Sequence, residues 1–456
     1  RIGRSIRVQV EGPSHHQVAG STAGGTTDCL PYLQYIRHIR SRAEVQFCLD
    51  TDAASMEEPY LDHLQRPLQP LGDHLEFSTY ETFEKDPVKY VEYQKAISLA
   101  LRDNLVGVHN KSVIIVVAGA GRGPLVNSAL KAIQGLVNVH QSVGFALYAV
   151  EKNPSAVVYL ESMARHEPSW KGLVTVVRSD MRDLTKTALG GQQADIVVSE
   201  LLGSFGDNEL SPECLDALYA TGVMKESTVC IPSHYTSYLA PVSSYRLHSE
   251  TRAQSYFPLN TSDGLDSSSM GILQALETPY VVRSHAACQT HVEQACWEFG
   301  HPSPTNGRER MAHVEFRPDV THGAGSGSGY GLFDQAVASM AQATANLISG
   351  PVAIHGFLGT FMAILYSSNR DDSSVTISTR PTNYSRGMFS WFPLYFPLRE
   401  PLHIPSGGTL VASMWRKCAP DRVWYEWCAR VVDKDGEVTA FSAIHNPNGR
   451  SYHVTL

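Results

Sequence analysis

The chain has 456 residues, of which 43% are hydrophobic and 18% are charged, and this composition excludes an intrinsically disordered protein. Its longest central apolar run, Val113 to Ala118, is far shorter than the about 20 residues that cross a bilayer, so we expect a soluble protein without membrane contact. The formal net charge of -8 argues against a nucleic-acid surface and favours basic, arginine-rich partners.

The N-terminal residues predict the end of a domain followed by a linker. Residues 1–16 are typical of a strand and show no signal-peptide pattern, so we expect most of a preceding domain to be missing. Residues 17–28 are mostly Ser, Thr, Gly and Ala, which predicts a flexible linker. Apolar residues at helical spacing follow over 32–39.

Metal ligands are not indicated. The eight cysteines contain no Cys-x-x-Cys pair, so we expect neither a zinc site nor a disulfide framework, which suits a reducing compartment. The adjacent pair His15-His16 has no third ligand in a recognisable pattern, and we favour a polar loop there.

The segment from Gln65 to Leu105 predicts two or three helices. It carries aromatic residues at positions 80, 83, 90 and 93, which include pairs three residues apart. For such a stripe, packing in the core is the default interpretation, with ligand contact as the alternative.

A regular alternation of strands and helices comes next. We predict strands at 113–118, 146–150, 174–177 and 195–198, with a helix from about Leu125 after the first. Parallel strands joined by helices form a doubly wound sheet whose ligand crevice lies beyond the carboxyl ends of the strands.

Candidate site residues follow each of these strands. The turn Gly119-Ala120-Gly121 follows the first strand, Glu151 the second, Asp180 the third and Glu200 the fourth. Glycines permit close approach of the backbone to a ligand, and an acid at the end of the second strand can accept both ribose hydroxyls. Asp180 is placed to meet an adenine. Together they predict a pocket for an adenosine-containing cofactor.

Two carboxylates, Glu200 and Glu209, share the loop that follows the fourth strand. A guanidinium is permanently charged and its forked donors match carboxylate oxygens in pairs, so two fixed acids would form a cradle for arginine. The alternative is a pair of solvated acids on an ordinary loop.

From about residue 233 the pattern changes to strands that alternate in polarity without intervening helices. Strands at 235–239, 375–378, 410–415 and 423–427 predict an antiparallel sheet or barrel. Ser/Gly-rich stretches at about 260–271 and 322–331 predict surface insertions, and an Ala-rich amphipathic helix is expected over 333–347.

With these residues in view, the chain resembles the catalytic half of the protein arginine methyltransferase 5 family, the type II, symmetric-dimethylating enzymes. The resemblance covers nearly everything except the insertions, and it is carried by the segments 67–71, 80–90, 118–126, 149–154, 179–182, 199–213, 387–393, 423–427 and 444–452. Gly206 stands where the family usually has Ala, and we expect it to loosen the loop by up to about 1 kcal/mol.

The resemblance implies an α/β fold with a Rossmann-like S-adenosylmethionine-dependent methyltransferase domain at 29–232, followed by an antiparallel β-barrel domain at 233–456. Insertions would lie near 252–272 and 322–350, and residues 1–28 would be the end of an N-terminal TIM barrel plus a linker. The implied activity is methyl transfer from S-adenosylmethionine to arginine in Arg/Gly-rich proteins and histone tails, which gives monomethyl and symmetric dimethylarginine.

The resemblance also implies a role for individual residues. Glu200 and Glu209 would be catalytic and hold the guanidinium. The residues implied to bind S-adenosylmethionine, without a metal, are Tyr80, Lys89, Tyr90, Gly119, Glu151, Asp180 and Met181. Those implied to line the arginine channel are Leu68, Phe83, Ser390 and Trp391, with Phe83 tied to the symmetric product.

Partners and location follow from the same resemblance. We expect a homo-oligomer in the cytoplasm and nucleus. The family's WD-repeat adaptor docks largely on the N-terminal barrel, most of which is missing here.

Two rival functions stay open from the residues. A nicotinamide-dependent dehydrogenase would also use a glycine turn and a ribose-binding acid, but it offers no role for Glu200 and Glu209. A non-catalytic scaffold that binds Arg-rich tails would need neither a cofactor acid such as Glu151 nor a substrate pair.

Overall fold

The computed structural model describes residues 58–104, 112–137, 143–254, 267–303, 307–317 and 351–456. The chain divides into two compact units, of which one comprises residues 1–63 and 283–285 and the other the remainder. In the first unit, the described part holds a short 3₁₀ helix, Glu58–Tyr60, and a bridge in which the Asp62 backbone N–H donates to the Arg283 carbonyl at 2.8 Å. The strand and helix expected before residue 40, and the pair His15-His16, lie outside the described residues.

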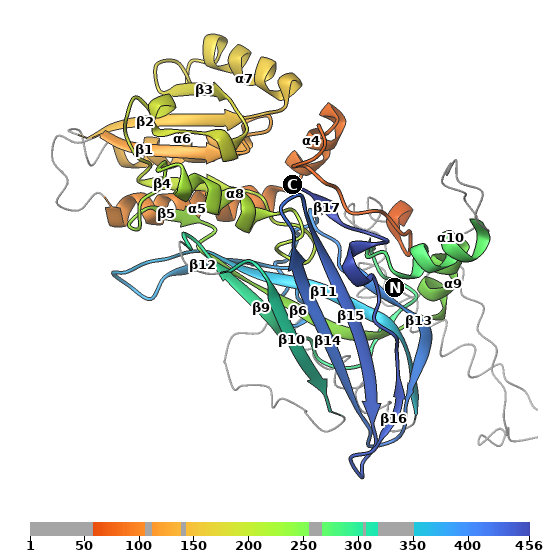
Figure 1. Cartoon of the computed structure of the whole chain (residues 1–456). Helices are drawn as coiled ribbons and strands as arrows, with labels where there is room; N and C mark the ends of the chain where they lie inside the picture. Colours follow the sequence, from red (N-terminus) through yellow and green to blue (C-terminus); the bar gives the residue numbers. More distant parts are fainter. Residues whose placement is uncertain (1–57, 105–111, 138–142, 255–266, 304–306, 318–350) are drawn as a thin grey trace, which may run out of the picture. The chain divides into compact units, whose positions relative to one another are not determined.

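The second unit begins its regular structure with two helices and a parallel sheet. The helices are α4 (Phe77–Glu84) and α5 (Pro87–Asn104), which agrees with the two or three expected. Five parallel strands follow in the order β3-β2-β1-β4-β5 (Figure 1). Their bounds are β1 Ser112–Ala118, β2 Gly144–Glu151, β3 Val174–Arg178, β4 Ile196–Ser199 and β5 Val229–Ile231. The four predicted strands are confirmed within two residues at each end.

Helices cover both faces of this sheet because side chains of a strand alternate between its faces. Ile115 and Val117 of β1 belong to a core shared with α5, α6 (Pro124–Val137) and α7 (Pro154–His166). Val116 and Ala118 belong to a second core with α8 (Ser211–Ala220). The remaining short helices of this region are η2 Met181–Asp183 and η3 Lys186–Leu189. The doubly wound arrangement is therefore confirmed.

The strands after β5 are antiparallel and form two sheets that share one core (Figure 1). The first sheet has the order β7-β13-β11-β6-β8, with β12 on β11 and β9 on β6, and the second has the order β10-β14-β15-β16, with β17 on β15. The strand bounds in chain order are β6 His234–Ser243, β7 Tyr280–Val281, β8 Cys288–Gln289, β9 Gln294–Gly300, β10 Arg310–Phe316, β11 Val352–Ser367, β12 Ser374–Ser378, β13 Leu394–Ile404, β14 Thr409–Cys418, β15 Arg422–Val432, β16 Val438–Phe441 and β17 Val454–Thr455. Every predicted strand of this region is present.

Short helices connect some of these strands. They are α9 Tyr245–Gln254, α10 Ser267–Leu276, η4 Pro381–Asn383 and η5 Pro447–Gly449. Helix α10 includes the end of the first expected insertion, whereas the second, with its helix at 333–347, lies outside the described residues. Within the described segments, no helix combines the length and apolarity that a bilayer crossing requires.

Candidate functional site

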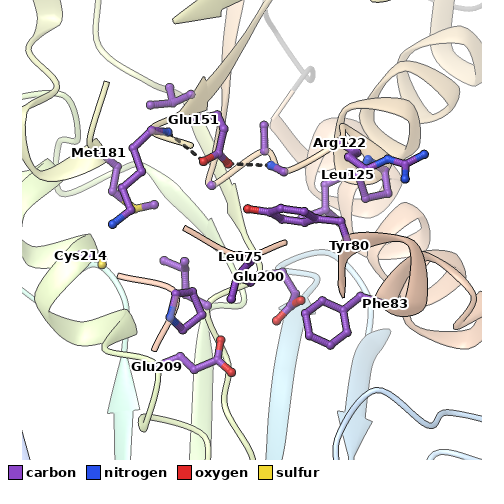
Figure 2. A pocket seen from close by; sticks show the side chains of 18 of the residues that line it. Leu75, Tyr80, Phe83, Arg122, Leu125, Glu151, Met181, Glu200, Glu209 and Cys214 are labelled. Atoms are coloured by element: carbon purple, nitrogen blue, oxygen red, sulfur yellow. Dashed lines mark hydrogen bonds between the residues drawn. The ribbon is translucent and has the colours of Figure 1, made fainter. Parts of the chain in front are cut away.

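A pocket lies where the strands of the parallel sheet end (Figure 2). Its lining comes from the segments that follow β1, β2, β3 and β4, together with residues of α4 and α5. Nine of the predicted site residues line it, namely Tyr80, Phe83, Tyr90, Gly119, Glu151, Asp180, Met181, Glu200 and Glu209. The fold thus brings together predicted site residues that lie as far apart in the sequence as Tyr80 and Glu209, a separation of 129 positions.

The glycine turn after β1 forms one wall of the pocket. Gly119 and Gly121 have positive φ angles of 75° and 54°, a region that residues with a Cβ rarely adopt. A Cβ at Gly121 would lie 3.1 Å from the ring of Tyr80, so the glycine lets this aromatic ring rest on the turn. The backbone N–H groups of Gly119 and Ala120 donate to the Val150 carbonyl, which fixes the turn against β2.

Glu151, at the end of β2, is held by backbone donors. Its Oε1 accepts from the N–H groups of Lys152 (2.8 Å) and Asn153 (2.7 Å), and its Oε2 accepts from Gly121 (2.8 Å) (Figure 2). A carboxylate oxygen accepts two hydrogen bonds, so Oε2 keeps capacity for one more donor. Glu151 is therefore a fixed, buried acceptor.

Asp180 and Tyr80 complete this half of the pocket. The Asp180 carboxylate caps η2 and pairs with Arg182 at 2.9 Å; although burial opposes ionisation, this guanidinium lowers the pKa of Asp180. The Tyr80 hydroxyl accepts from Asn153 at 3.3 Å, and burial, followed by the charge of Glu151, raises the pKa of Tyr80. An adenine that contacts Asp180, as predicted, would therefore either bind beside the Asp180–Arg182 ion pair or displace Arg182 from it.

Glu200 is paired with an internal cation. The Lys89 Nζ lies 3.3 Å from Glu200 Oε2, and the Lys89 side chain is only 1% exposed. The same ammonium lies 5.5, 4.9 and 5.0 Å from the ring centres of Phe83, Tyr90 and Trp391. Burial opposes the charge on Lys89, but Glu200, Tyr90 and Asp86 together outweigh this effect, and the pKa of Lys89 is raised. A cation thus already has favourable surroundings at this place.

Glu209 differs from Glu200 because no cation pairs with it among the described residues. Burial, reinforced by the charge of Glu200, raises the pKa of Glu209 well above its ordinary value, while Lys89 acts in the opposite direction. Figure 2 shows both carboxylates directed toward the same part of the pocket, with Phe83 beside Glu200. An additional cation would relieve the repulsion between the two acids.

The other four predicted site residues are absent from the described lining of the pocket. Lys89 forms an ion pair with Glu200, which does line the pocket, and the contact of Lys89 with the cofactor stays a prediction. Leu68 is 41% exposed. The Ser390 hydroxyl donates to Asp86 at 2.8 Å, and the Trp391 Nε1 donates to the Leu202 carbonyl at 2.6 Å. The channel-lining role of Leu68, Ser390 and Trp391 stays a prediction.

Two expectations about this region need correction. The core interpretation of the aromatic stripe is right for Tyr93, which is fully buried, whereas Tyr80 and Phe83 line the pocket, and Tyr90 both packs against the core and lines the pocket. Because α4 has no buried residue, its aromatic side chains are available to the pocket. The expected loosening by Gly206 is wrong, since its φ of +87° suits glycine and a Cβ would approach the Tyr235 ring to 3.0 Å.

Several residues that shape the site were not predicted from the sequence. Arg122, in the glycine turn, lines the pocket, lies 4.1 Å from the Phe77 ring centre and pairs with Glu81 on α4 at 2.8 Å. Asp86 accepts hydrogen bonds from the backbone of Phe389 and Ser390 at 2.9 Å each. The position of Arg122 within the predicted glycine turn could have indicated from the sequence that it lies at the pocket. Among the described residues, no group of three or more His, Cys, Asp or Glu side chains is arranged to hold a metal.

Comparisons with known proteins extend over nearly the whole chain. Residues 51–231 match a family model described as PRMT5 arginine-N-methyltransferase, and residues 234–454 match one described as PRMT5 oligomerisation domain. Protein arginine N-methyltransferase 5 of Xenopus laevis is 38% identical over 443 residues, which are 96% of this chain and 59% of that protein. The counterpart in Oryza sativa subsp. japonica is 36% identical over 468 residues, which are 100% of this chain and 61% of that protein. The chain thus spans about three fifths of the length of these relatives.

Solved structures share the fold at low identity. The crystal structure of Arabidopsis thaliana protein arginine methyltransferase 10 has a TM-score of 0.57 and 14% identity, with 83% of this chain and 100% of that chain covered. The Trypanosoma brucei PRMT1 enzyme-prozyme complex with AdoHcy has a TM-score of 0.55 and 12% identity, with 83% and 98% covered. The Rossmann-like domain followed by an antiparallel domain is thereby confirmed. From the two family models and the relatives together, the chain belongs to the PRMT5 arginine-N-methyltransferase family.

Proposed function

We propose that the chain is the catalytic part of a protein-arginine N-methyltransferase that takes its methyl group from S-adenosylmethionine. The observation that carries this proposal is the pair Glu200 and Glu209, which face one pocket while Glu209 has no cationic partner among the described residues. A planar guanidinium with donors on two sides satisfies both carboxylates at once. A dehydrogenase offers no use for this pair.

The half of the pocket around Glu151 suits the adenosine part of the cofactor. Gly119 and Gly121 leave room for close approach, Tyr80 offers an aromatic face and Glu151 has an acceptor position free for a ribose hydroxyl. Asp180 and Met181 line the same half, and Lys89 and Tyr90 lie toward the carboxylate pair. When bound, S-adenosylmethionine supplies a methyl group activated on a sulfonium.

The protein's own contribution is to hold the acceptor and to take its proton. Glu200 and Glu209 orient the guanidinium so that one terminal nitrogen faces the methyl group. Positioning of this kind lowers the activation free energy by roughly 7 kcal/mol or more when the reacting groups are well oriented. Because burial and the charge of Glu200 raise the pKa of Glu209, we assign Glu209 as the proton acceptor. Lys89 pairs with Glu200 and holds its carboxylate in place.

The finer specificity rests on the aromatic wall. We infer that Phe83 restricts the space at one guanidinium nitrogen and so directs the second methyl to the other, which gives symmetric dimethylarginine. Leu68, Ser390 and Trp391 would line the approach for the arginine side chain. We further infer that the substrates are Arg/Gly-rich proteins and histone tails, in agreement with the net charge of -8.

Assembly and location belong to the same proposal. The match of residues 234–454 to a model described as an oligomerisation domain supports self-association. A WD-repeat adaptor would dock on a part of the protein that precedes this chain, and the protein would act in both cytoplasm and nucleus.

Fragment-ion mass spectrometry on an Arg-Gly-rich peptide tests the proposal. The peptide is incubated with the protein and S-adenosylmethionine, and Glu200→Gln and Glu92→Gln are compared with wild type. Glu92 also pairs with a lysine of α5, Lys95 at 2.7 Å, but does not line the pocket, so it is a matched control. We expect dimethylated product from wild type and Glu92→Gln, and a loss of about a hundredfold or more for Glu200→Gln.

The fragments also separate the possible products. Neutral loss of monomethylamine identifies symmetric dimethylarginine, whereas loss of dimethylamine would keep the methyltransferase and overturn the role of Phe83. Cofactor binding without methylation would favour the scaffold. Stabilisation by NAD but not by S-adenosylhomocysteine in a thermal-shift assay would favour the dehydrogenase.

A further inference from the structure

The loop between β4 and α8, which carries Glu200 and Glu209, contains a strained position. Leu210, directly after Glu209, has a φ of +67°, in the left-handed region that residues with a Cβ rarely occupy. Such a conformation persists only where the surroundings determine it. Within the loop, Gly203 and Gly206 exchange two backbone hydrogen bonds, and Asn208 Oδ1 accepts from the Phe205 N–H at 2.7 Å.

Asp207, two residues before Glu209, is fully buried and accepts three hydrogen bonds from the antiparallel domain. The donors come from β14, β15 and β9, and they are Arg416 Nε (2.5 Å), Tyr425 OH (2.7 Å) and Trp297 Nε1 (2.9 Å). Ser237 Oγ of β6 lies 3.2 Å from Asp207 Oδ1 and donates its one hydrogen to the nearer Phe205 carbonyl of the same loop, at 2.7 Å. The loop around Asp207 is therefore anchored to four strands outside the Rossmann-like domain.

The same arginine also holds the far side of the loop. Arg416 Nη2 donates to both oxygens of Glu213, at 3.0 and 2.8 Å, and Arg416 Nη1 donates to the Arg308 carbonyl at 2.9 Å. Glu213 lies in the first turn of α8, four residues after Glu209. One fully buried guanidinium thus connects positions 207 and 213, which flank Glu209 on both sides.

A contribution to stability is a weak explanation for this buried cluster. Burying ionised groups carries a desolvation penalty that often equals their mutual attraction, and apolar replacements are often neutral or stabilising. In some proteins a buried ionic cluster instead serves to select one conformation over the alternatives. An apolar anchor acts on the same loop, because the Phe205 ring lies 5.4, 5.2 and 5.9 Å from the ring centres of Trp297, Phe396 and Tyr425.

We propose that Arg416 is a positioning residue for the substrate carboxylate Glu209, acting through Asp207 and Glu213. This inference rests on the proposed function. It assigns to the antiparallel domain a direct part in building the arginine subsite, beside any part in self-association. The cofactor half of the pocket is independent of it, since Glu151 is held by the backbone of residues 121, 152 and 153.

The test compares Arg416→Lys with wild type in the full chain. Lysine keeps the charge but cannot hold two carboxylates with a fixed fork. Arg450→Lys is a matched control, because Arg450 also pairs bidentately with a buried glutamate, Glu277, at 2.8 and 2.6 Å, and neither residue lines the pocket. Peptide KM and kcat are measured together with the affinity for S-adenosylhomocysteine, at a temperature where every variant is folded.

We expect Arg416→Lys to lower kcat/KM for the peptide about tenfold or more, because a displacement of about 1 Å can cost a hundredfold. The affinity for S-adenosylhomocysteine should stay within about twofold of wild type, and Arg450→Lys should change neither quantity by more than that. Tyr425→Phe removes one neutral donor to Asp207 and should lower kcat/KM by about threefold to tenfold.

A folded Arg416→Lys protein with unchanged peptide kcat/KM overturns the positioning role, as does an equal loss of affinity for S-adenosylhomocysteine. If Arg416→Lys does not fold, Tyr425→Phe decides by the same two criteria. The wild-type reaction separates the two proposals: absence of arginine methylation with intact cofactor binding contradicts the proposed function, whereas normal methylation by wild type and by both variants contradicts only the role of Arg416.

Discussion

The two acidic parts of the pocket are built in opposite ways. Glu151 accepts hydrogen bonds from three backbone N–H groups and lies at the carboxyl end of β2, an inner strand of the parallel sheet. Glu209 pairs with no cation among the described residues, and burial together with Glu200 raises its pKa. Glu151 therefore has hydrogen-bond partners in the absence of a ligand, whereas Glu209 has no cationic partner among the described residues.

This difference follows the chemistry of the proposed ligands. A ribose hydroxyl is neutral and needs an acceptor with a fixed direction, and its hydrogen bond is stronger when that acceptor is charged. A guanidinium brings its own charge, and an underpaired carboxylate binds it more strongly. The protein therefore accepts an unfavourable electrostatic state at Glu209 in the absence of substrate, as is common at functional sites.

The largest expected effect is on turnover. Glu209→Gln should lower kcat for an Arg-Gly-rich peptide by about a hundredfold to a thousandfold, since it removes both a charged partner and the proposed proton acceptor. The affinity for S-adenosylhomocysteine, measured by isothermal titration calorimetry, should change by less than about twofold. Full activity of this variant would remove Glu209 from the mechanism.

For the cofactor half of the pocket, we expect the substitution Glu151→Gln to lower the affinity for the cofactor. Glu151→Gln exchanges a charged acceptor for a neutral amide, and its NH₂ group would face backbone donors. We expect the Kd for S-adenosylhomocysteine to rise about tenfold to a hundredfold, because a hydrogen bond to a charged group contributes about 1.5–3 kcal/mol. With saturating cofactor, the peptide KM should be close to wild type. A rise in peptide KM of similar size would show that the two halves are not independent.

The pH dependence of peptide binding sharpens the contrast further. The groups that act on Glu209 are Glu200, which raises its pKa, and Lys89, which lowers it, while burial is the largest cause. Since the guanidinium requires the ionised form, peptide affinity should increase with pH above the ordinary glutamate range, by at most about tenfold per pH unit, and level off above the raised pKa. Titration of peptide affinity from pH 5 to 9 checks this. The increase should disappear in Glu209→Gln.

The smallest expected effect is on stability. A glutamate whose pKa is raised by folding favours the folded state below its unfolded pKa, and this contribution is lost as pH rises toward the folded pKa. Glu209→Gln should therefore raise the Tm of the ligand-free protein at neutral pH by roughly 2 °C, with no gain near pH 4. Thermal denaturation at both pH values measures it. A lower Tm of Glu209→Gln at neutral pH would mean that the ionised Glu209 carboxylate stabilises the folded state, which would contradict a raised pKa of Glu209.

The alternation of strands and helices was readable from the sequence because each element carries a local signature. Apolar runs such as 113–118 are long enough for a buried strand, and Gly119, Glu151, Asp180 and Glu200 lie at or just beyond the carboxyl ends of these strands. Since the strands are parallel, their carboxyl ends meet at one edge of the sheet, and this rule alone was enough to gather these residues into one pocket.

Tertiary structure decided the electrostatics of the site. The pairing of Lys89 with Glu200 joins positions 111 residues apart, and the anchoring of Asp207 by Arg416 joins positions 209 apart. Neither has a periodicity or spacing that a sequence displays, because a long-range ion pair depends on how distant segments pack, within one domain for Lys89 and Glu200 and between two domains for Arg416 and Asp207. The same holds for Tyr80 and Phe83, whose helical spacing is compatible with a core and with a pocket wall. Local patterns therefore determined which groups are present, while packing determined which of them are left without a partner.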